Sequence, residues 1–233
     1  GYALIPPSTW RIPNFTLLIF FALGIYPWYA VNQLPLVERF LVVFGEGPII
    51  AAVRVLPQGI ASLAAASVTP LILEKLGSPR WPISIGMLVA AVALVIMIFG
   101  EGLIHNGEYW RWYFPAFIIG SAGTLMAFLG TNITVLTSVP ARMSGVAGAL
   151  LQVSLQLGAV ISLSVQAGLF TLKPGTFENF ANVQASFWFQ AGWLLLNVIV
   201  FLIFFRPGRV AQDSEAAQAQ EKGGEGKLTT VAV

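Results

Sequence analysis

The sequence contains no cysteine, a single histidine and few charged residues. The absence of cysteine excludes a disulfide framework, a thiolate metal site and a cysteine nucleophile. Charged residues make up 9% of the 233 residues, whereas soluble domains carry about 25%. The net charge of +2, with the basic residues scattered along the chain, argues against nucleic-acid binding. Because 57% of the residues are apolar, we expect the lipid bilayer to be the partner of this chain.

Motifs for catalysis and nucleotide binding are also missing from the sequence. It has no phosphate-binding Gly-Lys-Ser/Thr loop, no His-Glu-x-x-His zinc motif and no Gly-x-Ser-x-Gly nucleophile elbow. We therefore expect no enzymatic activity, no catalytic residue, no cofactor and no metal.

Long apolar stretches are abundant, and they predict an all-α, polytopic membrane bundle. A membrane-spanning helix needs about 20 mostly apolar residues. Charged residues and prolines separate the stretches that meet this requirement. The expected spans are residues 15–34, 48–73, 83–99, 113–137, 144–170 and 185–205.

The composition divides the chain into three parts. We expect residues 1–14 to be a cytosolic linker or stub, residues 15–205 to be the transmembrane domain, and residues 206–233 to be a disordered cytosolic tail. The tail is rich in Ala, Gln, Glu, Gly and Lys and cannot bury enough apolar area to fold. The chain begins with Gly1 and has no signal-peptide pattern, so it reads as a fragment of a longer protein.

Lys and Arg residues in the connecting segments predict the orientation. Cytoplasmic loops of membrane proteins carry an excess of these residues. With six spans, eight of them fall on the side of both termini and three on the opposite side. Both termini are therefore expected in the cytosol. The larger group is Arg11, Lys75, Arg80, Arg142, Arg206, Arg209, Lys222 and Lys227, and the smaller is Arg39, Arg111 and Lys173.

Polar residues inside a span are costly and need a reason. Arg54 lies about two turns into the second expected span, and Gln58 and Ser62 follow at four-residue spacing on the same face. Pro57 interrupts the backbone hydrogen bonding there. Arg54 and Gln58 could contact substrate or provide a structural counter-charge at a cavity. Alternatively, Arg54 could extend its side chain to the membrane interface.

Amides occur in three other expected spans. The first span ends with Trp28, Tyr29, Asn32 and Gln33, which could line a cavity or cap the helix at the interface. Asn132 lies in the fourth span, and Gln152 and Gln156 lie one turn apart in the fifth. These amides could bind substrate or join helices by hydrogen bonds. Small residues recur every four positions in the fifth span, so Gly145, Gly148 and Gly158 are expected at close helix contacts.

Acidic residues are absent from the middle of every expected span. Proton-coupled transport generally uses a carboxylate or histidine within the membrane. If the protein uses protons, we expect the titrating group to lie outside this segment.

Several segments together resemble the major facilitator superfamily, in particular the fungal-type, fourteen-span branch of drug:proton antiporters. Residues 139–150 and 156–158 are similar to the Pro, Gly-x-Ala/Ser-Gly and Gln-Leu-Gly pattern of a late helix in that branch. Residues 54–60 match its Arg-x-x-Pro-x-Gly helix, and residues 109–115 are similar to its loop into the next helix. Residues 73–81 resemble its short cytoplasmic loop, with Glu74, Lys75, Gly77 and Arg80 as the motif positions.

The resemblance implies that this chain is the C-terminal, six-helix half of a transporter. Such carriers bind substrate between two halves near the middle of the membrane. The implied partners are a missing N-terminal half and a small-molecule substrate, and the implied activity is multidrug or small-solute efflux, coupled to protons through that other half. We expect the plasma membrane rather than the vacuole. An alternative is a non-transporting membrane subunit or scaffold.

Overall fold

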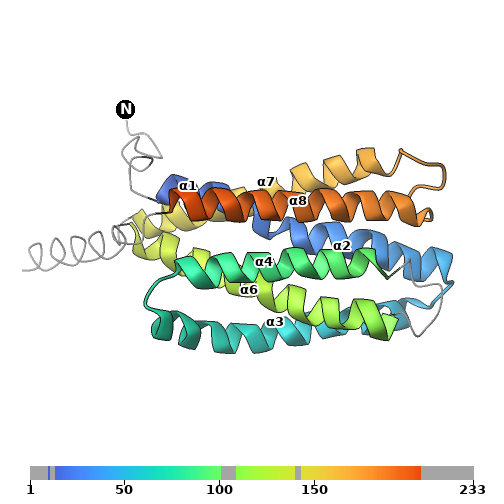
Figure 1. The fold of residues 1–233 in the computed structure, drawn as a ribbon, viewed down its shortest axis with the longest axis horizontal. Helices are drawn as coiled ribbons and strands as arrows, with labels where there is room; N and C mark the ends of the chain where they lie inside the picture. The colour runs from blue at the N-terminus through green and yellow to red at the C-terminus, as the bar shows by residue number, and fades with distance from the viewer. Residues whose placement is uncertain (1–9, 11–13, 101–108, 140–142, 206–233) are drawn as a thin grey trace, which may run out of the picture.

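The computed structural model describes residues 10, 14–100, 109–139 and 143–205 (Figure 1). Within these ranges the chain is helical and contains no strand. Six helical segments are long and apolar enough to cross a membrane, which confirms the all-α, six-span prediction. The expected terminal parts, 1–14 and 206–233, lie outside the described residues except for Trp10 and Asn14. The segments are α1–α2–η2 (Phe15–Val43), α3 (Pro48–Leu76), α4 (Arg80–Ile98), η3–α6 (Tyr109–Thr137), α7 (Ser144–Leu169) and α8 (Phe180–Phe204).

The first span is longer than the predicted residues 15–34. It consists of α1 (Phe15–Ile25), α2 (Pro27–Glu38) and a π-helical turn, η2 (Arg39–Val43). Pro35 lacks the N–H that would bond to the carbonyl of Val31. Gln166 of α7 donates its side-chain N–H to that carbonyl at 2.8 Å instead. The helix therefore continues through the proline because a neighbouring helix supplies the missing donor.

Arg39 is buried, although the sequence placed it in a connecting loop. Its Nη1 donates to the carbonyl oxygens of Phe177 at 2.7 Å and Glu178 at 2.6 Å. Its guanidinium also lies over the ring of Phe180, 5.4 Å from the centroid. These partners compensate for the loss of hydration and attach the end of the first span to the segment between α7 and α8.

Three other helices begin before the predicted residue. α4 begins at Arg80, the fourth span at Tyr109 and α8 at Phe180. Pro82 lies in the first turn of α4, where a missing N–H costs no helical hydrogen bond. Asn179 caps α8 by accepting a hydrogen bond from the backbone N–H of Ala181 at 3.2 Å.

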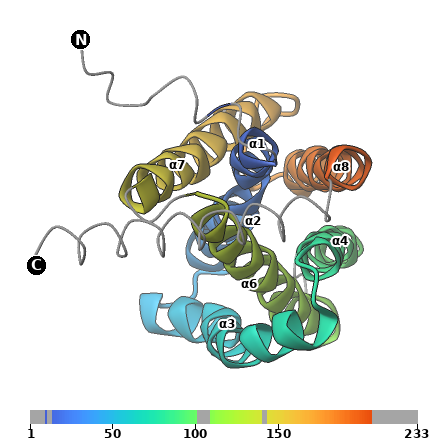
Figure 2. The same cartoon turned by 90° about the vertical axis from the view of Figure 1, so that its left-hand side faces the viewer.

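The helices form two flanks around α6. Figure 2 shows α6 near the centre, α4 and α8 together on one side, and α7 and α3 at opposite ends of the other side. The extensive contacts are between α4 and α6, α3 and α6, α4 and α8, and α1 and α7. α1 and α2 thus join the α7 side of the bundle to the rest of it.

Glycines allow two of these interfaces to close tightly. A Cβ on Gly86 of α4 would lie 2.4 Å from the carbonyl oxygen of Gly123 of α6, and one on Gly123 would lie 2.5 Å from the Gly86 carbonyl oxygen. In α7, a Cβ on Gly158 would lie 2.1 Å from the carbonyl oxygen of Leu23 in α1. These backbones approach at distances that no side chain permits.

Two of the expected packing glycines do not make such contacts. Within the described residues, a Cβ on Gly145 would have nothing within 4 Å, and one on Gly148 would meet only Leu136 Cδ2 at 3.8 Å. Within the described residues these two glycines make no close helix contact, so their assignment to packing stays a prediction. The reason is geometric: α1 crosses α7 near Gly158, and no described backbone comes as close to the first turns of α7.

The outer surface of the bundle is apolar. On α3, Ile49 is 81% exposed and Leu63 is 72% exposed. Large side chains with this exposure along a whole helix would be unfavourable in water. They are expected of a helix that faces lipid acyl chains.

Candidate functional site

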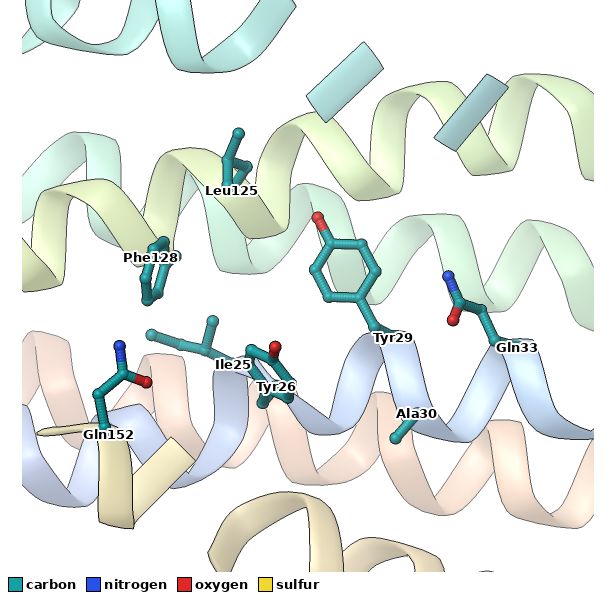
Figure 3. Close-up of a pocket in the computed structure, with 8 residues that line it drawn as sticks. All are labelled: Ile25, Tyr26, Tyr29, Ala30, Gln33, Leu125, Phe128 and Gln152. Atoms are coloured by element: carbon teal, nitrogen blue, oxygen red, sulfur yellow. The ribbon is translucent and has the colours of Figure 1, made fainter. Parts of the chain in front are cut away.

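The candidate site is a cavity of about 620 Å³ between α1–α2, α6 and α7 (Figure 3). α2 provides Tyr29, Ala30 and Gln33, and Ile25 and Tyr26 lie at the junction of α1 and α2. None of the eight lining residues is charged, so the cavity combines aromatic and aliphatic surface with a few hydrogen-bonding groups. This is the usual character of a small-molecule site. The lining residues are Ile25, Tyr26, Tyr29, Ala30, Gln33, Leu125, Phe128 and Gln152.

Tyr29 joins three helices at the wall of the cavity. Its hydroxyl donates to the carbonyl oxygen of Ser121 in α6 at 3.3 Å. It also lies 3.1 Å from the hydroxyl of Ser62 in α3. The carbonyl can only accept, so the Ser62 hydroxyl serves as the donor to Tyr29 when both bonds form. The Tyr29 ring is therefore fixed in position, with its one hydroxyl hydrogen directed to protein.

The wall next to Tyr29 is supported by a chain of amides. Gln33 Nε2 donates to Gln58 Oε1 at 2.7 Å, and Gln58 Nε2 donates to Asn32 Oδ1 at 3.0 Å. Asn32 Nδ2 in turn donates to the carbonyl oxygen of Trp28 at 2.5 Å. Asn32 and Gln58 are buried, whereas Gln33 is half-buried and lines the cavity. Of these three amides, only Gln33 is placed to contact a ligand directly.

Trp28 fixes α2 from the opposite side. Its indole N–H donates to the carbonyl oxygen of Ala90 in α4 at 3.0 Å. The ring packs against Gly120 of α6, where an added Cβ would lie 2.2 Å from Trp28 Cζ2. α2, which supplies three of the eight lining residues, is therefore held by α3, α4, α6 and α7.

Arg54 is located in a separate cluster and does not line this cavity. Its Nη2 forms an ion pair with Glu46 Oε1, and its guanidinium lies 4.9 Å from the ring centroid of Tyr109 and 5.4 Å from that of Phe40. The Tyr109 hydroxyl donates to the Arg54 carbonyl at 2.6 Å. Protein groups thus surround the Arg54 guanidinium. Arg54 connects α3 with Tyr109 of η3 and with Glu46, which lies in the connection before α3.

The remaining predicted site residues are dispersed. Gln152 is exposed and lines the cavity from α7. Gln156, one turn further, is also exposed but is not part of the lining. Asn132 is half-buried on α6, outside the cavity. The residues singled out in the sequence therefore contribute Tyr29, Gln33 and Gln152 to the wall, with Asn32 and Gln58 behind it.

The sequence analysis did not single out Tyr26, Leu125 and Phe128, which also line the cavity. A signal for the first was present. Tyr26, Tyr29 and Gln33 lie at positions i, i+3 and i+7, which share one face of a helix. Leu125 and Phe128 are ordinary apolar residues of a membrane helix, and nothing in the sequence distinguishes them from lipid-facing neighbours.

The expected loop motif forms a turn between α3 and α4. Gly77 has φ +61°, a left-handed conformation that favours glycine, and its N–H bonds to the carbonyl of Leu73. Arg80 Nη2 donates to the carbonyl oxygen of Leu202 in α8 at 2.7 Å. Glu74 and Lys75 are exposed. This turn therefore lies at the same end of the bundle as the C-terminal end of α8.

Comparison with known proteins gives one distant relative to consider. No family model matches the sequence, and no solved structure matches the chain. Over 133 residues the chain is 28% identical to a protein of Streptomyces glaucescens named tetracenomycin C resistance and export protein. The match covers 57% of the chain but only 24% of that relative. The chain is thus a multi-helix membrane protein with distant similarity to part of an export protein.

Proposed function

We propose that this chain is one six-helix half of a secondary transporter that exports small molecules. The observation that carries the proposal is the uncharged cavity of aromatic and amide residues between α2, α6 and α7. Its walls come from three separate parts of the bundle, and a second half would complete a substrate site between the two halves. The distant relative, by its name, is an export protein, which supports the same activity.

Membership of the fourteen-span drug:proton antiporters belongs to this proposal and rests on the sequence motifs. The missing N-terminal half would complete the cavity and hold the proton-titrating group, because none of the cavity residues in this chain is acidic or basic. Transport would proceed by rocking one half against the other. We place the protein in the plasma membrane, with both termini in the cytosol.

Filling the cavity tests the proposal. Gln152→Trp, introduced into the complete gene product that includes this chain, should place an indole in the space lined by Tyr26 and Phe128. Because Gln152 is exposed in the bundle, the substitution should leave the fold intact. We expect at least a tenfold loss of efflux of a panel of fluorescent aromatic compounds, measured at two external pH values.

Gln156→Trp is the matched control, since Gln156 has the same side chain on the same helix and lies outside the lining. It should retain efflux at an equal membrane level of protein. Efflux by Gln152→Trp equal to that of the parent would remove the cavity from the transport path. An equal loss in both variants would assign the effect to α7 as a whole and would also contradict the proposal.

A further inference from the structure

The amide chain behind the cavity has a direction that the protein backbone sets. An amide side chain can be turned over, so which of its ends donates must follow from its partners. The chain ends at the carbonyl oxygen of Trp28, which can only accept. Asn32 must therefore direct its NH₂ to Trp28 and its oxygen to Gln58.

The same reasoning fixes the next two amides. Gln58 must donate to the Asn32 oxygen, which leaves Gln58 Oε1 to accept from Gln33 Nε2 at 2.7 Å. Asn32 and Gln58 are 0% and 2% exposed, so water cannot satisfy them if either is turned over. One of the two N–H groups of the Gln33 amide is thus committed to protein. In Figure 3 the nitrogen and oxygen of Gln33 lie on opposite sides of its amide.

Gln33 Oε1 remains as the end of the chain. No donor in the described part of the protein bonds to it, and Gln33 lines the cavity. The Tyr29 hydroxyl hydrogen is directed to Ser121 and is not available to a ligand. Gln33 Oε1 is therefore the hydrogen-bond acceptor that the network leaves for a ligand.

We infer that Gln33 Oε1 selects uncharged, flat aromatic substrates that carry a hydroxyl group, and that Gln58 is the positioning residue for this selection. The inference rests on the proposed export function. The hydroxyl donates to Gln33 Oε1, while Tyr26, Tyr29 and Phe128 provide the aromatic and apolar walls. A methyl ether of the same ring system has no hydrogen to donate and would face an acceptor oxygen. A site built to bond a substrate hydroxyl rejects an analogue that lacks it, because the site group is left unpaired.

The test compares 1-hydroxypyrene with 1-methoxypyrene, two fluorescent probes that differ by one methyl group. Binding is measured with the purified full-length protein in lipid nanodiscs, and empty nanodiscs correct for partitioning into lipid. We expect the parent protein to bind the hydroxyl probe about tenfold more tightly, a modest preference because Gln33 is only half-buried. Equal binding of the two probes, or binding of neither, overturns the inference.

Two variants separate selection from structural support. Gln33→Met removes the acceptor at similar length, so it should weaken binding of the hydroxyl probe to the level of the ether and leave ether binding unchanged. Gln58→Met frees the Gln33 amide to turn, so its NH₂ can reach the ether oxygen. The preference should then fall to less than threefold through tighter binding of the ether, which a merely weakened fold would not produce.

The result for Gln33→Met decides the inference if Gln58→Met does not fold. A preference that survives in Gln33→Met overturns the role of its oxygen. Efflux from cells reports separately on the proposed function. If the parent protein exports other aromatic compounds but shows no preference for the hydroxyl probe, the proposed function stands and this inference falls. If it binds the hydroxyl probe selectively but exports nothing, the selectivity of the site stands and the proposed export function falls.

Discussion

Gly158 is the position where the structure makes its most direct prediction about stability. A Cβ there would lie 2.1 Å from the Leu23 carbonyl oxygen, 2.7 Å from its carbonyl carbon and 2.8 Å from its Cα. All three atoms belong to the backbone of α1, so no side-chain rotation relieves the overlap. Ordinary contacts of this kind begin at 3.4 Å, and the two helices would have to separate locally by about 1.3 Å.

A separation of this size removes much of the attraction between α1 and α7. A gap of 0.5–1 Å already forfeits roughly a quarter to a half of the dispersion energy of the contacting atoms. In a bilayer there is no hydrophobic force between helices to compensate, because packing and hydrogen bonds provide the association. We expect Gly158→Ala to cost about 3 kcal/mol, at the upper end of the range for overpacking. Since about 1.4 kcal/mol is a factor of ten, the ratio of folded to unfolded protein should fall roughly a hundredfold.

The assay is the yield of monodisperse protein by fluorescence-detected size-exclusion chromatography, followed by the thermal midpoint of unfolding. Gly148→Ala is the matched control on the same helix, because its added methyl would meet only Leu136 Cδ2 at 3.8 Å. It should unfold within a few degrees of the parent. Equal stability of the Gly158→Ala and Gly148→Ala variants would refute the view that α1 crosses α7 at Gly158.

Three further predictions concern other contacts. Arg54→Met or Glu46→Gln alone should destabilise the protein by about 1–2 kcal/mol, between the values for exposed and buried pairs, and the double variant by less than the sum of the two, because a single change leaves a half-buried charge without its partner; additive losses in thermal unfolding would contradict the pairing. Gly86→Ala should lower the folded yield by roughly tenfold or more, since its Cβ would lie 2.4 Å from the carbonyl of Gly123; a parent-like chromatogram would argue against this interface. Asn182→Leu should make residues 170–176 sensitive to protease, because the Asn182 amide bonds to carbonyls of that segment at 2.8–3.0 Å; unchanged cleavage would assign no ordering role to this residue.

The number and type of the elements followed from the sequence, because apolar runs long enough to cross a bilayer have few other folds available. The boundaries failed where another helix supplied what the local sequence lacked. Pro35 and Arg39 read as a stop signal, yet Gln166 satisfies the carbonyl exposed by Pro35, and the carbonyls of Phe177 and Glu178 satisfy Arg39. These partners are more than a hundred residues away, and no local pattern reveals them.

The site was only partly predictable for a related reason. Polarity within a span marked Gln58, Asn32 and Gln152 as notable, but it did not indicate which of them reaches a cavity. Gln58 lies behind the wall and Gln152 lies in it. Likewise, Arg54 was identified as a charge within a span, whereas its pairing with Glu46 in the connection before α3 required the fold. Small residues at four-residue spacing marked both Gly148 and Gly158, and only the position at which the α1 backbone approaches α7 distinguishes them.

The arrangement of the two ends of the bundle leads to a final prediction. Lys75 lies just before the α3–α4 turn, and Arg80 connects that turn to the end of α8 through Leu202. Lys173 lies between α7 and α8, the segment that Arg39 attaches to the end of the first span. Figure 1 shows these connections at opposite ends of the molecule. Both lysines are exposed.

The chain has no cysteine, so Lys75→Cys and Lys173→Cys each introduce a single site for a membrane-impermeant maleimide within it, and any cysteine in the rest of the complete protein is first replaced by serine. In intact cells expressing the complete protein, only the Lys173→Cys variant should react, because the excess of Lys and Arg places the Lys75 side in the cytosol. Both variants should react after permeabilisation. Labelling of Lys75→Cys alone would keep the fold and reverse its orientation. Labelling of both in intact cells would be incompatible with six spans between the termini, and the cavity between α2, α6 and α7 would then no longer lie within a membrane-spanning bundle.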